Sequence, residues 1–135
     1  MPEVQLPKSK PKPKYDKWSR QAGGSPFIIQ VPPTIIPEAT ITFCGESCGY
    51  NEVLEKKGFV GGSGNVLWNM AKAAGINPEK VNRTKVTKRR PTGDNFGIFY
   101  HDPKERKHPT EELIFWQELL RREIEKYEPK VIVAI

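Results

Sequence analysis

Short apolar runs separated by polar and glycine-rich stretches predict four strands, at 27–31, 39–44, 81–87 and 131–135. The second run stops at Gly45, which is typical of a buried strand that opens into a loop. The last run is apolar on both faces, as central strands of parallel sheets are. We therefore expect residues 131–135 to be a buried central strand.

Two stretches with apolar residues at helical spacing lie between these strands. Ser63 and Thr110 are the predicted N-caps, and Gly75 and Pro129 mark the two ends. The stripe of the first helix comprises Val66, Leu67, Met70, Ala71 and Ala74, and that of the second comprises Leu113, Trp116, Leu120, Ile124 and Tyr127. The alternation predicts an α/β fold of three layers, α/β/α, around a central parallel sheet that is apparently incomplete at the C-terminus.

The flanking and connecting segments are polar. Residues 1–24 alternate proline with lysine and predict a disordered basic tail, either a solubilising leader or an arm on DNA, with Trp18 docked on the domain. Residues 25–135 then form one partial domain. Residues 88–107 are expected to be a long loop, with Phe96, Ile98, Phe99 and Tyr100 partly buried and both histidines in solvent.

Charge and cysteine content narrow the function classes. The net charge of +6 and pI of about 9.4 favour a polyanionic partner, although solvated lysines would give the same balance. No apolar run predicts a membrane span or a secretory signal, so we expect a cytoplasmic protein. Cys44 is expected to be a buried small hydrophobe and Cys48 a loop residue, and their spacing predicts no metal site.

The loop after the second strand is the best candidate for a ligand site. It runs from Gly45 to Glu52, and a glycine-rich stretch, 58–64, follows it. In open α/β sheets, ligands bind at the carboxyl ends of the strands, and glycines there let the backbone approach them closely. The spacing alone does not define the chemistry of the site.

Five segments of the chain, in order, carry a resemblance to a known family. They are Gly45-Glu46-x-x-Gly49-x-x-Glu52, then Gly58-Phe59-Val60-Gly61-x-Ser63-Gly64-x-x-Leu67, the strand and turn from Thr84 to Pro91, Pro109-Thr110-x-Glu112, and the strand from Pro129 to Ile135. The pattern resembles the N-terminal half of the family 4 (iron–sulfur type) uracil-DNA glycosylases, in the uracil-DNA glycosylase superfamily.

The resemblance implies roles for individual residues. Phe59 would stack on an extruded uracil, Glu46 would be the catalytic residue, and Lys85 would stand where the family's asparagine reads the base edge. The remaining base-binding positions would be Gly45, Ser47, Cys48 and Gly49. Two alternatives stay open: Phe59 as a core aromatic beneath the glycine loop, and Glu46 as a carboxylate that accepts backbone N–H groups.

Departures from the family are as informative as the matches. The cysteines that hold its cluster are absent, with Arg89 and Trp116 at two of their positions, so we expect no cofactor. The family's late histidine motif is also absent. The basic residues Arg83, Lys88, Arg89 and Arg90 would bind DNA phosphates, or else form a solvated strand end.

These observations predict a domain that hydrolyses the N-glycosidic bond of uracil or another damaged base in DNA repair, on single-stranded or damaged DNA. The chain alone would have at best very weak activity, and a second chain or a missing C-terminal segment would complete its sheet. The main alternative is a non-catalytic DNA-binding module associated with phage or bacterial replication machinery. A binder of small nucleotides is a third possibility.

Overall fold

Three parallel strands form the central sheet of the computed structural model, which describes residues 27–135. They are β1 (Ile41–Gly45), β2 (Val81–Lys85) and β5 (Val131–Ala134), in the order β2-β1-β5. Ile41 lies opposite Val81 on one side and Val131 on the other. The predicted tail, 1–24, and its Trp18 lie outside the described residues.

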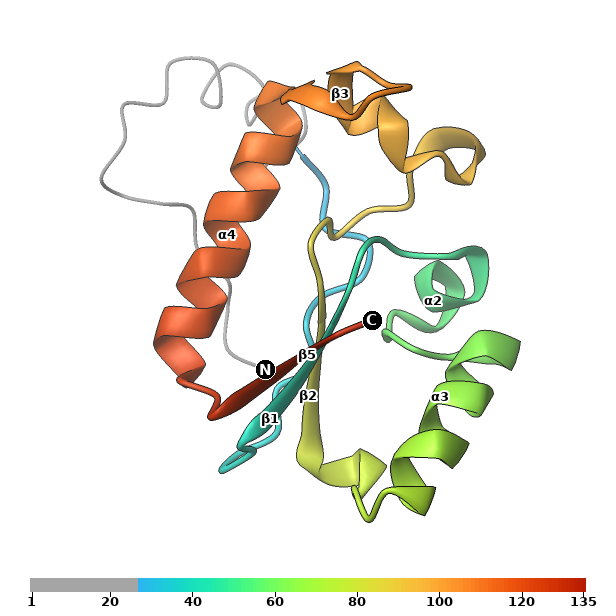
Figure 1. Ribbon diagram of the computed structural model, residues 1–135, viewed down its shortest axis with the longest axis vertical. Coiled ribbons are helices and arrows are strands. Elements are labelled where there is room, and N and C mark those ends of the chain that lie inside the picture. Colours follow the sequence, from blue (N-terminus) through green and yellow to red (C-terminus); the bar gives the residue numbers. More distant parts are fainter. Residues whose placement is uncertain (1–26) are drawn as a thin grey trace.

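Helices cover both faces of this sheet. Figure 1 shows α4 (Glu111–Tyr127) on one side, and α3 (Gly61–Ala73) with the short α2 (Tyr50–Glu55) on the other. The predicted α/β/α layers around a parallel sheet are confirmed. This order places the loops that follow β1 and β2 at one end of the sheet, between the two helical layers.

Two predicted strands differ in the structure. The run 131–135 was expected at the centre of the sheet, but β5 is the outer strand of the described sheet, and Val131 is 51% exposed. The run 27–31 is not a strand. The N–H groups of Gln30 and Val31 both donate to the carbonyl of Lys88, so this segment is held across the turn after β2 rather than in the sheet.

Helix α3 is rotated relative to its predicted stripe. Its N-cap is Val60 rather than Ser63, and its buried residues are Gly64, Trp68 and Ala71. Val66 and Met70, predicted to be buried, are exposed. The rotation has a local cause, because the indole Nε1 of Trp68 donates to the carbonyl of Phe59 at 2.7 Å.

Gly64 permits the same close approach. A Cβ at this position would lie 2.3 Å from the carbonyl oxygen of Phe59. We expect Gly64→Ala to lower the free energy of unfolding by about 1–3 kcal/mol, because the helix must move away from that loop. The matched control is Gly62→Ala in the same helix, where a Cβ meets nothing within 4 Å. Urea unfolding measures both, and equal stabilities for the two variants would contradict the close contact.

Helix α4 begins as predicted and then differs in its buried face. The Thr110 hydroxyl accepts the N–H of Leu113 and caps the helix. Leu113 and Trp116 are buried as expected, but Leu119 and Glu123 are buried where Leu120 was predicted. A carboxylate on this face indicates a polar contact with the sheet.

The predicted loop 88–107 has local structure. It contains two 3-10 turns, η2 (Thr92–Asp94) and η3 (Phe96–Phe99), and an antiparallel hairpin of β3 (Tyr100–Asp102) and β4 (Lys107–Pro109). A further turn, η1 (Pro78–Lys80), precedes β2. Ile98 and Tyr100 are partly buried and His101 and His108 are exposed, as predicted, whereas Phe96 and Phe99 are more deeply buried than predicted.

Apolar side chains gather in two clusters. The first joins the start of α4 to η3 and comprises Phe27, Phe96, Phe99, Leu113, Phe115, Trp116 and Leu119. The second lies between the sheet and α3 and comprises Phe43, Phe59, Trp68, Ala71 and Val81. The second cluster supports the glycine-rich stretch 58–64, because Phe59 belongs to both.

Candidate functional site

One buried carboxylate organises the carboxyl end of β1 and β2. Glu52, 8% exposed, accepts the N–H of Gly49 at 2.9 Å through Oε1 and the N–H of Phe59 through Oε2. Lys85 Nζ lies 3.0 Å from the same Oε2. Because the carboxylate binds two loops and the end of β2 together, it fixes the geometry of the site. The sequence motif contains Glu52, but no role was predicted for it. Its signal was the capping-box spacing, three residues after Gly49.

Phe59 is held in an uncommon conformation. Its φ is +59°, a left-handed value that a non-glycine residue adopts only when its surroundings enforce it. Glu52 and the Trp68 indole hold its N–H and its carbonyl. Its ring meets Phe43 and Trp68 edge-on, at centroid distances of 6.4 and 6.1 Å. The ring is therefore part of the core.

Lys85 covers the Phe59 ring. Its ammonium nitrogen lies 4.0 Å from the ring centroid, a cation–π contact, and the side chain is 8% exposed. A Cβ on Gly45 would lie 2.8 Å from the same nitrogen. The structure thus brings together Gly45, Phe59 and Lys85, three predicted base-binding residues. The ammonium stands where a base stacked on this face of the ring would lie.

The two cysteines lie at the end of β1 and in the loop after it. Cys48 is a loop residue as predicted, but it is 1% exposed, and its Sγ donates to the carbonyl of Thr87 at 3.6 Å. Cys44, expected to be buried, is only partly so. The contact with Thr87 draws the loop after β1 under the end of β2, which buries Cys48. Ser47, beside it, is half-buried.

Burial raises the pKa of the Cys48 thiol from 9.0 to about 12, with Glu52 adding to the rise. An unfolded thiol ionises near pH 9, so unfolding releases a proton between these two values, and stability falls as pH rises through that window. We expect iodoacetamide to leave Cys48 unmodified in a folded Cys44→Ser variant at neutral pH, and to alkylate it in urea. Equal rates in the two states would contradict this burial.

Glu46, the predicted catalytic residue, lies at the surface of the site. Its side chain is half exposed, and Oε2 lies 3.1 Å from a guanidinium nitrogen of Arg106, in the turn between β3 and β4. The carboxylate therefore faces solvent, and within residues 27–135 it accepts no backbone N–H group, as the alternative role would require. Arg106 was not predicted, because nothing in the local sequence links the hairpin to this loop.

The predicted phosphate-binding residues occupy different environments. Lys88, a predicted phosphate contact, is buried: its side chain is 0% exposed, and Nζ lies 2.7 Å from Glu123 Oε2. Arg83 stacks on Trp68 at 4.1 Å and donates to the carbonyl of Gly58. Arg90, whose side chain is 35% exposed, pairs with Asp94. The cluster therefore divides into buried and accessible cations.

Arg89 and Trp116, at two positions where the resembled family has cluster cysteines, share one partner. Arg89 forms a two-pronged ion pair with Glu112, and the indole Nε1 of Trp116 donates to the same carboxylate at 2.9 Å. The chain has two cysteines, and burial raises the pKa of both thiols. An iron–sulfur cluster needs thiolate ligands, so these residues do not fit one. Residues 27–135 contain no group of three or more metal-ligating side chains placed to hold an ion.

The described helices include none that is both long and apolar enough to cross a membrane.

Three curated relatives are named Type-4 uracil-DNA glycosylase. The protein of Sulfurisphaera tokodaii is 35% identical over 106 residues, which are 78% of this chain and 43% of the relative. Those of Archaeoglobus fulgidus and Saccharolobus solfataricus are 34% and 32% identical, over 73% of this chain and 44% and 41% of their own lengths.

The chain thus spans less than half the length of these relatives. The model of the Uracil DNA glycosylase superfamily matches residues 32–135, which include all the loops of the site described above. The matched range therefore contains the whole three-stranded sheet and the loop after β1. This chain belongs to the uracil DNA glycosylase superfamily.

Proposed function

We propose that the chain carries the base-binding part of a DNA glycosylase that hydrolyses the N-glycosidic bond of uracil or another damaged base. The observation that carries the proposal is the arrangement of Gly45, Phe59 and Lys85 around Glu52, at the carboxyl end of the sheet. The membership of the superfamily supports it. The reaction needs a base turned out of the stack, so single-stranded DNA is the preferred substrate.

In this proposal Lys85 meets the edge of the base. Its ammonium has only donors, so it favours bases that present carbonyl oxygens, as uracil does. When the bond between C1′ and the base nitrogen breaks, its electron pair goes to the base, which leaves as an anion. A cation at this position stabilises that charge, an effect that is typically large in a water-poor site. The base displaces the ammonium sideways from Phe59 and keeps it within hydrogen-bonding distance.

Glu46 holds the water in this scheme. The water oxygen bonds to C1′, one proton passes to the carboxylate and on to the departing base, and the sugar keeps the hydroxyl. The ion pair with Arg106 restrains the position of the carboxylate. Arg90 and Arg89 remain candidates for phosphate contact, since their side chains are 35% and 27% exposed.

The test is release of uracil from single-stranded DNA with the protein in excess, beside a binding comparison between uracil- and thymine-containing strands. Because the chain spans less than half the length of its relatives, we expect slow release by the chain and a clear preference for uracil in binding. Glu46→Gln should lower release about tenfold or more, whereas Glu105→Gln, an exposed carboxylate in the hairpin, should not. If the protein neither releases uracil nor prefers uracil-containing strands in binding, the proposal is refuted.

A further inference from the structure

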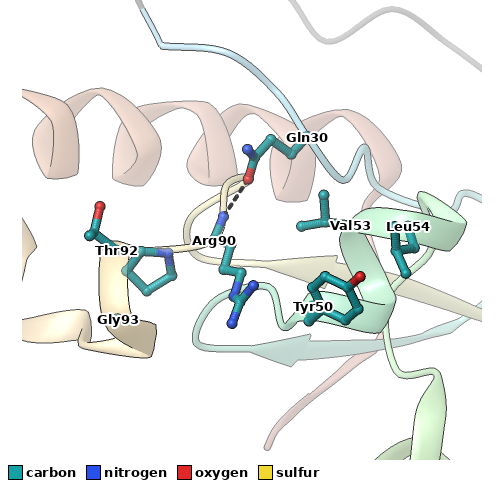
Figure 2. A pocket seen from close by; sticks show the side chains of 8 residues that line it. Gln30, Tyr50, Val53, Leu54, Arg90, Thr92 and Gly93 are labelled. Atoms are coloured by element: carbon teal, nitrogen blue, oxygen red, sulfur yellow. Dashed lines mark hydrogen bonds between the residues drawn. The ribbon is translucent and has the colours of Figure 1, made fainter.

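A surface groove lies beside the site, and Arg90 is the one lining residue to which the proposed function gives a role. It has a volume of about 370 Å³ and is lined by α2, by the turn at 90–93 and by Gln30. Figure 2 shows Tyr50 and Arg90 next to one another at its centre, with Leu54 at one end and Thr92 at the other. The Gln30 side chain accepts the backbone N–H of Arg90 at 2.7 Å, which holds the backbone of Arg90 in place.

The groove combines an open aromatic face with a cation. Tyr50 is 60% exposed and Leu54 63% exposed, so both present apolar surface to solvent. The Arg90 guanidinium lies over one face of the Tyr50 ring, 5.4 Å from its centroid, and donates hydrogen bonds of 2.7 and 2.8 Å to Asp94. A base would stack on the opposite face of the ring. An exposed ring beside an oriented guanidinium is the combination that binds unpaired nucleotides, the ring by stacking and the guanidinium through phosphate.

The position of the groove identifies which nucleotide it fits. Tyr50 directly follows Gly49, the last residue of the base-binding loop, and Arg90 lies five residues after Lys85 along the chain. Both walls of the groove thus continue the two segments that form the site. A volume of about 370 Å³ lies at the small end of the range for ligand sites, about 300–1,000 Å³, which suits one nucleotide.

We propose that this Tyr50–Arg90 groove binds the nucleotide next to the extruded one in a single DNA strand. Its base stacks on the Tyr50 ring, and its phosphate binds Arg90 in competition with Asp94. The proposal rests on the proposed function for the identity of the strand, while the stacking and phosphate contacts stand on the groove itself. Stacking needs an unpaired base, so the groove discriminates against duplex DNA.

The experiment measures binding of a short, labelled oligothymidylate without uracil, by fluorescence anisotropy at several salt concentrations. Tyr50→Leu should weaken binding about tenfold or more, and Tyr50→Phe should retain wild-type affinity, because the ring supplies the stacking energy. Arg90→Gln should weaken binding and lower the salt slope by about one. Asp94→Asn should strengthen it, because the carboxylate no longer competes for Arg90. The matched control is Arg121→Gln, an exposed arginine of α4 that also pairs with carboxylates.

Several outcomes would overturn the proposal. Wild-type affinity in Tyr50→Leu, or an equal loss in Tyr50→Phe, would remove the stacking role. An affinity for free thymidine monophosphate equal to that for the oligonucleotide would make the groove a small-nucleotide site instead. Uracil release is measured on the same variants. Groove-dependent binding with neither uracil release nor a preference for uracil would contradict the proposed function alone, and release with groove-independent binding would contradict the groove alone.

Discussion

Replacing Glu123 by alanine is expected to lower the free energy of unfolding by about 3–5 kcal/mol, because the change leaves the buried Lys88 ammonium without its counter-ion. Lys88 Nζ lies 2.7 Å from Glu123 Oε2 and donates to Thr84 Oγ1 at 3.1 Å. The Thr84 hydroxyl donates in turn to the other carboxylate oxygen at 2.6 Å. The loss is large because the ammonium is fully shielded from water in the folded chain and solvated in the unfolded one.

Urea unfolding followed by tryptophan fluorescence measures this loss. Glu125→Ala is the matched control, because that carboxylate lies two residues further along α4 in an exposed pair with Arg121 and should have little effect. The double variant Lys88→Met, Glu123→Leu should recover much of the loss, since it buries no charge. If Glu123→Ala and Glu125→Ala unfold at the same urea concentration, the buried pair does not stabilise the fold.

The second large effect concerns Lys85 in the proposed reaction. We expect Lys85→Met to slow uracil release on the order of a hundredfold, because the departing base loses the charge that stabilises it. The variant should be less stable, because the buried Glu52 loses its counter-ion, but Glu52 keeps its hydrogen bonds to the N–H groups of Gly49 and Phe59 and so still holds the loop; urea unfolding of the variant checks that it is folded under the assay conditions. The methionine also keeps the apolar contact of the side chain with the Phe59 ring.

Release by excess protein from single-stranded uracil DNA measures this effect, with Lys72→Met, an exposed lysine of α3, as the control. A rate in Lys85→Met above that of the unchanged chain would mean that the ammonium blocks the pocket. Unchanged rates in both variants would place the base elsewhere. A fall in both would show only a general dependence on charge.

The layers of the fold follow from the sequence, while the faces of its helices do not. The apolar runs and the Thr110 cap predict the positions of β1, β2, β5 and α4, because spacing and capping are local properties. Trp68 is buried rather than Met70 because its indole binds the carbonyl of Phe59. The spacing of apolar residues within a helix gives no information about such a partner outside the helix. The run 27–31 has the composition of a strand, but its N–H groups find their partner at Lys88.

The backbone of the candidate site can be predicted from the sequence, whereas its ion pairs cannot. The glycines after β1 and the family resemblance are enough to locate the loop. Two buried ion pairs, Lys85 with Glu52 and Lys88 with Glu123, each join residues from different elements. The positions of these residues along the sequence do not indicate that they meet. Lys88 was predicted to be a solvent-facing phosphate contact because its partner, Glu123, is distant in the sequence. A lysine beside two arginines is usually exposed, unless a carboxylate from another layer accompanies it.

The two separate apolar clusters have a consequence for partial opening of the molecule. The cluster at the start of α4 joins that helix to residues 96–99 and to Phe27, whereas the cluster under α3 contains Phe59. Local unfolding follows contiguous packed units, so opening of the first cluster releases η3 and the start of α4 without exposing the Phe59 ring. Opening of the second releases α3 and the base-binding loop together. The Phe59 loop can therefore loosen while α4 keeps its packing, and η3 can move while the Phe59 ring stays covered.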